Sequence, residues 1–462
     1  MKEYFDLIAP ERKKWKTKNW YYYTLLEKYF KFFIPEGSNV LEIGCGTGEL
    51  LNSVKPQNGV GVDLSEKMIK IATNQFNNLM FVVQDAERLS ISEKYNYIII
   101  SDLISSINDV QLLFENVREV SNPNTKIIIS NYNYLWEPIL KLGELIGLKA
   151  KQPLTNWLSI KDIKNLLDLS GFEIIKIERK ILLPKYVPFI SWFFNKFIAN
   201  IPLIDRLTLV NFIVVRKKEL VRKETSVSII IPARNERGNI ENAILRTPGF
   251  AIDQEFIFIE GNSSDGTFDE IQRVKEKYYD KNIRIMKQTG KGKGNAVREA
   301  FDEASGDILM ILDADLTMPP EDLPKYYKAL VENKAEFVNG CRLVYPMEGQ
   351  AMRFLNLIAN KFFGILFTFL IGQHLKDTLC GTKVLFKSDY EKIKTNRPYF
   401  GEFDPFGDFD LLFGASKLNL KIVEVPIRYR DREYGETQIK RFTHGWLLIK
   451  MSVFAAFKLK FI

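Results

Sequence analysis

The chain has 462 residues, of which 46% are hydrophobic and 26% are charged, and its formal net charge is +8. This composition excludes a disordered chain, and the length exceeds one ordinary hydrophobic core, so we expect two or three domains. The positive charge permits an anionic partner, namely nucleic acid, an acidic lipid surface or a phosphorylated substrate, without choosing among them. The three cysteines, Cys45, Cys341 and Cys380, lack metal-site spacing and fit a reducing compartment.

The sequence offers no recognisable export or membrane-spanning segment. The first twenty residues lack the apolar centre of a signal peptide. No uncharged apolar run reaches the roughly 18 residues that a membrane-spanning helix needs.

The first half of the chain alternates short apolar strands with helical segments. A helix expected near residues 21–33 precedes the strand and turn of NVLEIGCGTGEL. Further strands are expected in GVGVDLS, MFVVQDAERL, YNYIIISDL and TKIIISNYN. This alternation predicts a parallel, doubly wound α/β sheet.

Polar and glycine residues follow three of these strands. Gly44, Gly46 and Gly48 follow the first, and glycine lets a backbone turn tightly and approach a ligand closely. Asp63 ends the second strand, about 20 residues further on, where an acidic residue binds ribose in nucleotide-binding folds. Asp85 follows the third strand, so all of these residues are predicted to share one edge of the sheet.

The series E-x-G-x-G-x-G, V-D-L-S and Q-D-A-E resembles the class I methyltransferases that use S-adenosylmethionine, over residues 21–133. The resemblance implies that Glu42 and the three glycines line the methionine end of this cofactor. It also implies that Asp63 holds the ribose and that Asp85 and Ala86 flank the adenine. A Rossmann-like domain that binds another nucleotide, or none, is the alternative.

The sequence identifies no base for methyl transfer. Asp102, in ISDLISS, is a candidate by its position only, and a strand-end or helix-capping aspartate is the alternative interpretation. Alignment of donor and acceptor supplies most of the catalysis in such a transfer, so a base is optional.

An apolar, aromatic stretch at residues 182–215 is followed by RKKELVRKETS, a charged segment typical of a linker. We therefore predict a first domain of residues 1–222, with an apolar C-terminal extension and a charged linker. The second domain is predicted at residues 223–462.

A second α/β pattern begins at VSIIIPARNE and continues through EFIFIEGNSSDGT, IRIMKQ, DILMILDAD, EFVNGCR and LKIVEVPIRYR. DILMILDAD ends in Asp313 and Asp315, which lie on the same side of an extended segment. Two like charges so placed repel each other unless a positive group lies nearby.

QTGKGKGNA, which contains Lys293, is a basic glycine-rich loop before a helix, and such a loop suits phosphate. Taken alone, each motif is more often a surface feature, but their order and spacing favour one site.

In order, these motifs resemble the family 2 glycosyltransferases of GT-A fold, and within them the dolichyl-phosphate mannosyltransferase-like enzymes, across nearly all of residues 226–432. The chain is thus expected to contain two doubly wound α/β domains in series, one Rossmann-like and one GT-A. The resemblance implies that Asp313 and Asp315 are catalytic and hold Mg²⁺ or Mn²⁺ on the donor diphosphate. It implies a nucleotide-sugar pocket lined by Pro232, Arg234, Glu236, Glu260, Asn262, Asp265, Lys293 and Asp313.

The acceptor is less well defined. The resemblance implies that Arg342 and Arg353 contact the acceptor phosphate or the leaving diphosphate. A sugar hydroxyl would need a general base, for which Asp408 and Asp410 are the candidates, whereas a lipid phosphate is already ionised and needs none. The sequence departs from the family pattern in Glu-Gly-Asn at 260–262, which leaves the base of the nucleotide open, and at Thr317.

Two apolar segments with basic edges, residues 353–374 and 445–462, predict helices that lie in a membrane interface. Core helices or a contact between domains are the alternative. We expect a cytoplasmic protein that is peripheral on the inner face of the cell membrane. No nucleic-acid module is recognised, and the oligomeric state stays open.

The sequence therefore predicts a bifunctional transferase. Its second domain would perform metal-dependent, inverting glycosyl transfer from a nucleotide-diphosphate sugar to a polyprenyl phosphate. Its first domain would transfer methyl groups from S-adenosylmethionine in the same glycan or glycolipid pathway. The alternative is transfer to a saccharide hydroxyl, with a first domain that binds S-adenosylmethionine without turnover.

Overall fold

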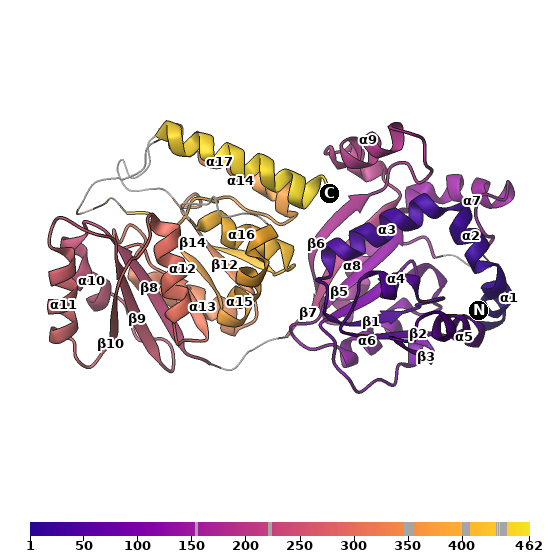
Figure 1. Ribbon diagram of the computed structural model, residues 1–462, viewed down its shortest axis with the longest axis horizontal. Helices are drawn as coiled ribbons and strands as arrows, with labels where there is room; N and C mark the ends of the chain where they lie inside the picture. Colours follow the sequence, from indigo (N-terminus) through magenta and orange to yellow (C-terminus); the bar gives the residue numbers. More distant parts are fainter. Residues whose placement is uncertain are drawn as a thin grey trace. The chain divides into compact units, whose positions relative to one another are not determined.

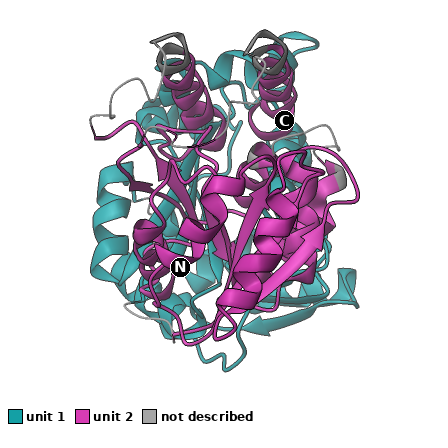
Figure 2. Ribbon diagram, turned by 90° about the vertical axis from the view of Figure 1, so that its left-hand side faces the viewer, with its two compact units in different colours: residues 1–219, 461 teal, residues 220–460, 462 magenta. Residues whose placement is uncertain are grey.

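A computed structural model describes residues 1–152, 156–219, 224–345, 354–399, 407–430, 432, 434 and 441–462. At 354–358, 398, 408 and 441–445 it describes the backbone without the side chains. The chain divides into two compact units, residues 1–219 with Phe461 and residues 220–460 with Ile462 (Figure 2). Each unit contains one mixed seven-stranded sheet covered by helices, so the predicted pair of α/β domains in series is confirmed.

The sheet of the first unit has the strand order β3–β2–β1–β4–β5–β7–β6. Its strands are β1 (Asn39–Ile43), β2 (Asn58–Asp63), β3 (Met80–Val83), β4 (Tyr97–Ser101), β5 (Lys126–Tyr132), β6 (Phe172–Lys180) and β7 (Val210–Lys217). Strands β1 to β5 pair in parallel, as predicted. In contrast, β7 runs antiparallel to both β5 and β6. The chain after β6 turns back beside that strand without a crossover connection. The next strand, β7, is therefore antiparallel to β6.

Helices cover this sheet (Figure 1). They are α1 (Lys2–Ile8), α2 (Arg12–Lys18), α3 (Trp20–Phe33), α4 (Glu49–Ser53), α5 (Glu66–Gln75), α6 (Val110–Val120), α7 (Glu137–Leu145), α8 (Ile160–Leu169) and α9 (Ile190–Lys196). The strands of the parallel part are almost continuously apolar because helices bury both faces of the sheet.

An aromatic cluster fixes α3 to the sheet. Phe212 of β7 is fully buried, and its ring centroid lies 5.4, 5.5 and 5.6 Å from those of Tyr29, Phe30 and Phe33 on α3. The spacing of these three residues places them on one face of the helix. Aromatic pairs at such distances add to the free energy of burial.

The sheet of the second unit has the order β10–β9–β8–β11–β13–β12–β14. Its strands are β8 (Val227–Ala233), β9 (Gln254–Glu260), β10 (Asn282–Lys287), β11 (Ile308–Ile311), β12 (Phe337–Cys341), β13 (Lys383–Phe386) and β14 (Ile422–Pro426). Strands β10, β9, β8 and β11 are parallel neighbours, whereas β13 runs antiparallel to β11 and β12. The four parallel strands bring the predicted donor motifs to one edge of the sheet.

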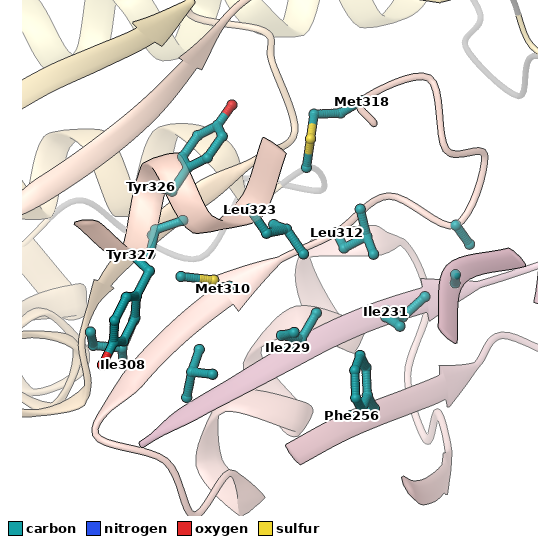
Figure 3. Packing of buried hydrophobic residues seen from close by; sticks show 14 of the residues in the cluster. Ile229, Ile231, Phe256, Ile308, Met310, Leu312, Met318, Leu323, Tyr326 and Tyr327 are labelled. Atoms are coloured by element: carbon teal, nitrogen blue, oxygen red, sulfur yellow. The ribbon is translucent and has the colours of Figure 1, made fainter. Parts of the chain in front are cut away.

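The helices of the second unit are α10 (Ile240–Leu245), α11 (Thr267–Lys277), α12 (Lys293–Glu303), α13 (Leu323–Val331), α14 (Phe354–Ile371), α15 (Lys387–Asn396), α16 (Asp408–Lys417) and α17 (Arg441–Ala455). Ile229 of β8, Met310 of β11 and Leu323 of α13 belong to one buried cluster (Figure 3). This core fixes β8 and β11 in place, and with them the starting points of the loops that follow these strands. In the part of the chain that the structure describes, no helix is long and apolar enough to cross a membrane.

Replacing Phe212 with alanine should lower the free energy of unfolding of the first unit by about 3–5 kcal/mol, because the cavity cannot close between α3 and the sheet. Five of the six tryptophans lie in the first unit, so the urea dependence of tryptophan fluorescence reports mainly on its unfolding. Leu7→Ala, at a side chain that is 75% exposed, is the matched control and should change little. An equal effect of both substitutions would contradict the assigned core.

Candidate active sites

The glycine turn of the first unit connects β1 to α4 and has a backbone that requires glycine. Gly44, Gly46 and Gly48 all have positive φ angles, of 77°, 53° and 81°. The N–H of Gly46 donates to Oδ2 of Asp63 over 2.8 Å, and the N–H of Ser65 donates to Oδ1 over 2.9 Å. The turn after β1 and the end of β2 are therefore joined, as the sequence predicted from strand order.

Glu42 lies at the base of this turn and is 2% exposed. Its Oε2 atom has no hydrogen-bond partner within the described residues. Burial raises the pKa of Glu42 to about 8, although the nearby Lys16 opposes that shift. A buried acceptor without a donor fits a ligand that brings a positive donor, such as the amino group of S-adenosylmethionine.

Asp85 and Ala86 lie just beyond β3. Asp85 caps the short 3₁₀ turn Ala86–Arg88, since its Oδ1 accepts a hydrogen bond of 3.0 Å from the N–H of Glu87. Ala86 is buried. Their predicted contact with adenine stays a prediction.

Arg12 of α2 was missed by the sequence analysis. Its Nε is buried without a partner among the described residues. Its guanidinium lies within electrostatic range of Tyr23, Tyr132, Glu49 and Asp63. No motif identified it, because its position depends on how α2 packs over the sheet.

In the second unit, Asp313 forms an ion pair with Lys293 of the glycine-rich loop, with Oδ1 and Nζ 2.5 Å apart. Although burial opposes ionisation, Lys293 and the further charges of Lys383 and Arg342 hold the pKa of Asp313 below its usual value. The loop before α12 and the loop after β11 thus meet, and Lys293 places a positive group beside Asp313.

A glycine leaves room for this pair. A Cβ atom added to Gly381, just before β13, would overlap the carboxylate of Asp313 and the ammonium group of Lys293. The sequence did not predict the antiparallel strand β13. The residues just before this strand lie beside Asp313 and Lys293.

Asp315 is held by a different cation. Arg432 donates to Oδ2 of Asp315 over 2.6 Å and to Oε1 of Glu236 over 3.1 Å. The N–H and hydroxyl of Thr317 donate to Oδ1 of Asp315, at 3.2 and 2.8 Å. Burial raises the pKa of Glu236 to about 7, against the effect of Arg432. Arg432 thereby links the loops after β8 and β11.

The loops after β8 and β9 interlock. The N–H of Asn235 donates to the hydroxyl of Ser263 over 3.0 Å, and Oδ1 of Asn235 accepts from the N–H of Ser264 over 2.9 Å. Asp265 accepts from the N–H of Arg237 over 3.2 Å and from the hydroxyl of Tyr434 over 3.3 Å.

The remaining predicted donor residues lie at the same edge. Pro232 belongs to β8, and the exposed side chain of Arg234 follows that strand. Buried Glu260 ends β9 and accepts a hydrogen bond from the N–H of Ser263, while Asn262 follows with φ +57°. The structure brings these residues to one edge of the sheet, and their contact with a nucleotide stays a prediction.

The predicted acceptor and base residues are less closely gathered. Arg342 forms a two-point ion pair with buried Asp377, at 2.7 and 2.8 Å, so its guanidinium is already engaged. Asp410 is 6% exposed and pairs with Arg397 over 2.8 Å. Arg353 and the side chain of Asp408 lie outside the described residues.

The described residues contain no group of three or more His, Cys, Asp or Glu side chains that could hold a metal ion. Asp313 and Asp315 offer carboxylate oxygens, the ligands that Mg²⁺ and Mn²⁺ prefer. Magnesium is usually bound through one or two carboxylates together with the phosphates of a substrate. The pair therefore fits a metal that is completed by a diphosphate.

Comparison with known proteins identifies both units. Residues 228–394 match the family described as glycosyl transferase family 2, and residues 19–177 match a methyltransferase domain. The glycosyltransferase AglJ of Haloferax volcanii is 30% identical over 48% of this chain and 69% of its own length. The dolichol-phosphate mannosyltransferase of Pyrococcus furiosus is 32% identical over 46% of this chain, which spans 59% of that relative.

A solved structure, described as an S-adenosylmethionine-dependent methyltransferase and possible histamine N-methyltransferase of Thermotoga maritima, is also similar. It is 16% identical and covers 47% of this chain and 100% of its own, with a TM-score of 0.38. On the sequence matches, the chain belongs to glycosyltransferase family 2 and carries a methyltransferase domain ahead of it.

Gly381→Ala should abolish detectable binding of nucleoside diphosphate with Mn²⁺, because the added methyl group displaces Asp313 and Lys293. Isothermal titration calorimetry with GDP and with UDP measures this. Gly249→Ala is the matched control, since nothing lies within 4 Å of its added Cβ. Unchanged binding by Gly381→Ala would show that the Asp313–Lys293 pair does not form the donor site.

Proposed function

We propose that the second unit transfers a hexose from a nucleoside-diphosphate sugar to a polyprenyl phosphate, and that the first unit transfers methyl groups from S-adenosylmethionine. The observation that carries the glycosyl-transfer proposal is the meeting of Asp313, Lys293, Asp315 and Arg432 at one edge of a family 2 glycosyltransferase sheet. Two carboxylates and two cations are suited to hold a metal–diphosphate group, in which positive and negative charges must both be matched.

Asp313 and Asp315 would hold Mg²⁺ or Mn²⁺ in this proposal. When bound, the ion neutralises charge that develops on the leaving nucleoside diphosphate. Lys293, at the N-terminus of α12, would exchange its carboxylate partner for phosphate oxygens. Arg432 would do the same, since both cations pair with carboxylates that the metal would take over.

A lipid phosphate acceptor agrees with the ion pair that engages Asp410, one of the two candidate bases. Asp410 is buried in an ion pair, so it is poorly placed to take a proton from a sugar hydroxyl. A phosphate monoester needs no base because it is largely ionised near pH 7. The name of the Pyrococcus relative, a dolichol-phosphate mannosyltransferase, points to the same kind of acceptor.

The surface of the second unit supports contact with a membrane. Helices α14 and α17 pack against each other and expose large apolar side chains, namely Phe362, Ile365, Trp446, Ile449 and Val453. The ammonium group of Lys450 lies 5.8 Å from the ring of Trp446. Trp beside Lys on an apolar helix face is typical of segments that lie among lipid headgroups.

For the methyltransferase unit, the proposal rests on the glycine turn, the Asp63 contacts and the unpartnered oxygen of Glu42. The resemblance implies that the glycine turn and Glu42 line the methionine end of S-adenosylmethionine and that Asp63 holds its ribose. A pathway shared with the glycosyl transfer is proposed because the two domains belong to one chain.

Asp315→Asn should reduce glycosyl transfer at least about 100-fold, since it weakens metal binding at the leaving group. The assay follows labelled hexose from GDP-mannose or UDP-glucose into dolichyl or undecaprenyl phosphate with Mn²⁺. Asp322→Asn, at a carboxylate paired with the exposed Lys325, serves as the matched control. Full activity in EDTA, or a loss of less than about threefold in Asp315→Asn, would contradict metal-assisted transfer.

Ile365→Glu combined with Trp446→Glu should abolish flotation of the protein with phosphatidylglycerol liposomes, because two charges enter the apolar face of α14 and α17. Leu245→Glu changes an equally exposed leucine of α10 and should leave flotation unchanged. If the wild-type protein does not float, or if all the variants float alike, these helices do not bind the membrane.

A further inference from the structure

Asp102, directly after β4, has a left-handed backbone conformation. Its φ angle is +52°, in the left-handed region that a residue with a Cβ rarely adopts. The N–H of Asp102 is held by Ser130 of β5, with the backbone oxygen at 3.0 Å and the hydroxyl oxygen at 3.2 Å. A backbone held in this way is often found at functional sites, where it aims a side chain.

The carboxylate of Asp102 points into a cluster of hydroxyl groups. The hydroxyl of Tyr22 donates to Oδ2 over 2.7 Å, and the hydroxyl of Ser130 donates to Oδ1 over 3.0 Å. The side chain of Tyr132 lies close to Asp102, and its ring centroid lies 6.1 Å from that of Tyr22. Among the described residues, Asp102 has no ion-pair partner within 4 Å.

A capping role does not account for this carboxylate. The 3₁₀ turn that follows, Ile104–Ser106, has Leu103 as its N-cap residue and no side-chain cap. The hydroxyl of Ser105 donates to the backbone oxygen of Asp102 and not to its carboxylate. Partial burial of a carboxylate that lacks a direct ion-pair partner costs free energy, so a role in ligand binding is the better explanation.

Asp102 lies on the same side of the sheet as the glycine turn. Strands β1 and β4 pair in parallel up to Ile43 and Ile100, so the two turns that follow are neighbours. The side chain of Leu103 fills the space that a Cβ atom on Gly44 would need. The guanidinium of Arg12 is within electrostatic range of both Asp63 and Asp102.

We propose that Asp102, together with Tyr22 and Tyr132, forms the methyl-acceptor site of the first unit, and that it accepts the proton of an acceptor hydroxyl group. The inference rests on the proposed methyl transfer from S-adenosylmethionine and names the chemical class of its acceptor. It assigns a role to three side chains that neither the glycine turn nor the Asp63 contacts explain.

The chemistry explains why a carboxylate is needed. The acceptor oxygen forms a bond to the methyl carbon, and the bond between that carbon and sulfur breaks with its electron pair left on sulfur. The hydroxyl proton passes to Asp102, either directly or through the hydroxyl of Tyr22. A hydroxyl is a weak nucleophile until a base takes its proton, whereas an uncharged amine is already nucleophilic.

The environment of Asp102 also sets the pH dependence. Burial raises the pKa of Asp102, and hydrogen bonds from Tyr22 and Ser130, with the charge of Arg12, oppose the rise. The carboxylate must be ionised to accept a proton, so transfer is lost as the pH falls through its raised pKa. Removing the Tyr22 hydroxyl removes one opposing contact, and the acidic limb should then move to higher pH.

Asp102→Asn tests the proposal because it preserves the shape of the side chain. The assay uses radiolabelled S-adenosylmethionine with mannose, glucose, their 1-phosphates and geraniol as hydroxyl acceptors, and glucosamine as an amine. Transfer to a hydroxyl acceptor should fall at least about 100-fold. Calorimetry with S-adenosylhomocysteine should give a dissociation constant within twofold of that of the wild type. Asp168→Asn, at an exposed carboxylate of α8, is the matched control.

Tyr22→Phe provides a second, independent readout. It should bind S-adenosylhomocysteine normally and shift the acidic limb of the activity profile to higher pH. The proposal is overturned if Asp102→Asn keeps more than a third of wild-type activity or loses S-adenosylhomocysteine binding. It is also overturned if the limb does not move in Tyr22→Phe, or if none of the hydroxyl compounds is methylated. Failure of the wild-type protein to bind S-adenosylhomocysteine would overturn the proposed methyl transfer itself.

Discussion

Asp313, two residues after β11, is a partly buried carboxylate that needs a positive group beside it, and the ion pair with Lys293 supplies that group. The loop before α12, the start of β13 and the loop after β11 are all shaped around this contact. Gly381 is needed because any side chain there would occupy the same space. Asp315 is likewise paired with a cation, Arg432, which also forms an ion pair with Glu236.

This balance of charge has a consequence for ligand binding. A metal with a diphosphate brings both signs of charge, so the two carboxylates and the two cations can exchange partners without any of them becoming isolated. In the proposed function, the site would bind a ligand in which a cation and an anion arrive together. A purely anionic or purely cationic ligand would leave two of the four groups unpaired, which is costly where they are shielded from water.

The carboxylates of the methyltransferase unit have different partners from those of the second unit. Glu42 has an oxygen without a partner, and Asp102 is surrounded by hydroxyl groups in place of cations. Both carboxylates have raised pKa values because burial is only partly offset. In the proposed methyl transfer, Glu42 would accept a hydrogen bond from a positive donor and Asp102 would accept a hydroxyl proton.

Strand order explains what the sequence could predict. Asp63, Asp313 and the residues after β8 and β9 follow apolar strands in parallel pairs, so their common edge could be inferred from the pattern alone. Contacts between distant segments could not be inferred in this way. Arg432 meets Asp315 across 117 residues, and Tyr22 meets Asp102 across 80, through packing that no local motif encodes.

The same limit applies to the antiparallel strands and to Arg342. Strands β7 and β13 have the apolar pattern of the parallel strands, and their direction depends on the path of the connecting chain. Arg342 matched a family motif by position, yet Asp377, which lies 35 residues further on, engages its guanidinium. A motif identifies a residue type at a position, whereas the partner of that residue is decided by the folded chain.

In the proposed function, the four charged groups at the edge of the second sheet bind a divalent ion and a nucleoside diphosphate as one unit. The most direct test is calorimetric titration of the wild-type protein with GDP and UDP, with Mn²⁺ present and with Mn²⁺ replaced by EDTA. The account predicts binding of at least one nucleotide with Mn²⁺ that weakens at least about tenfold in EDTA. Equal affinity under both conditions, or no binding of either nucleotide with Mn²⁺, would contradict it.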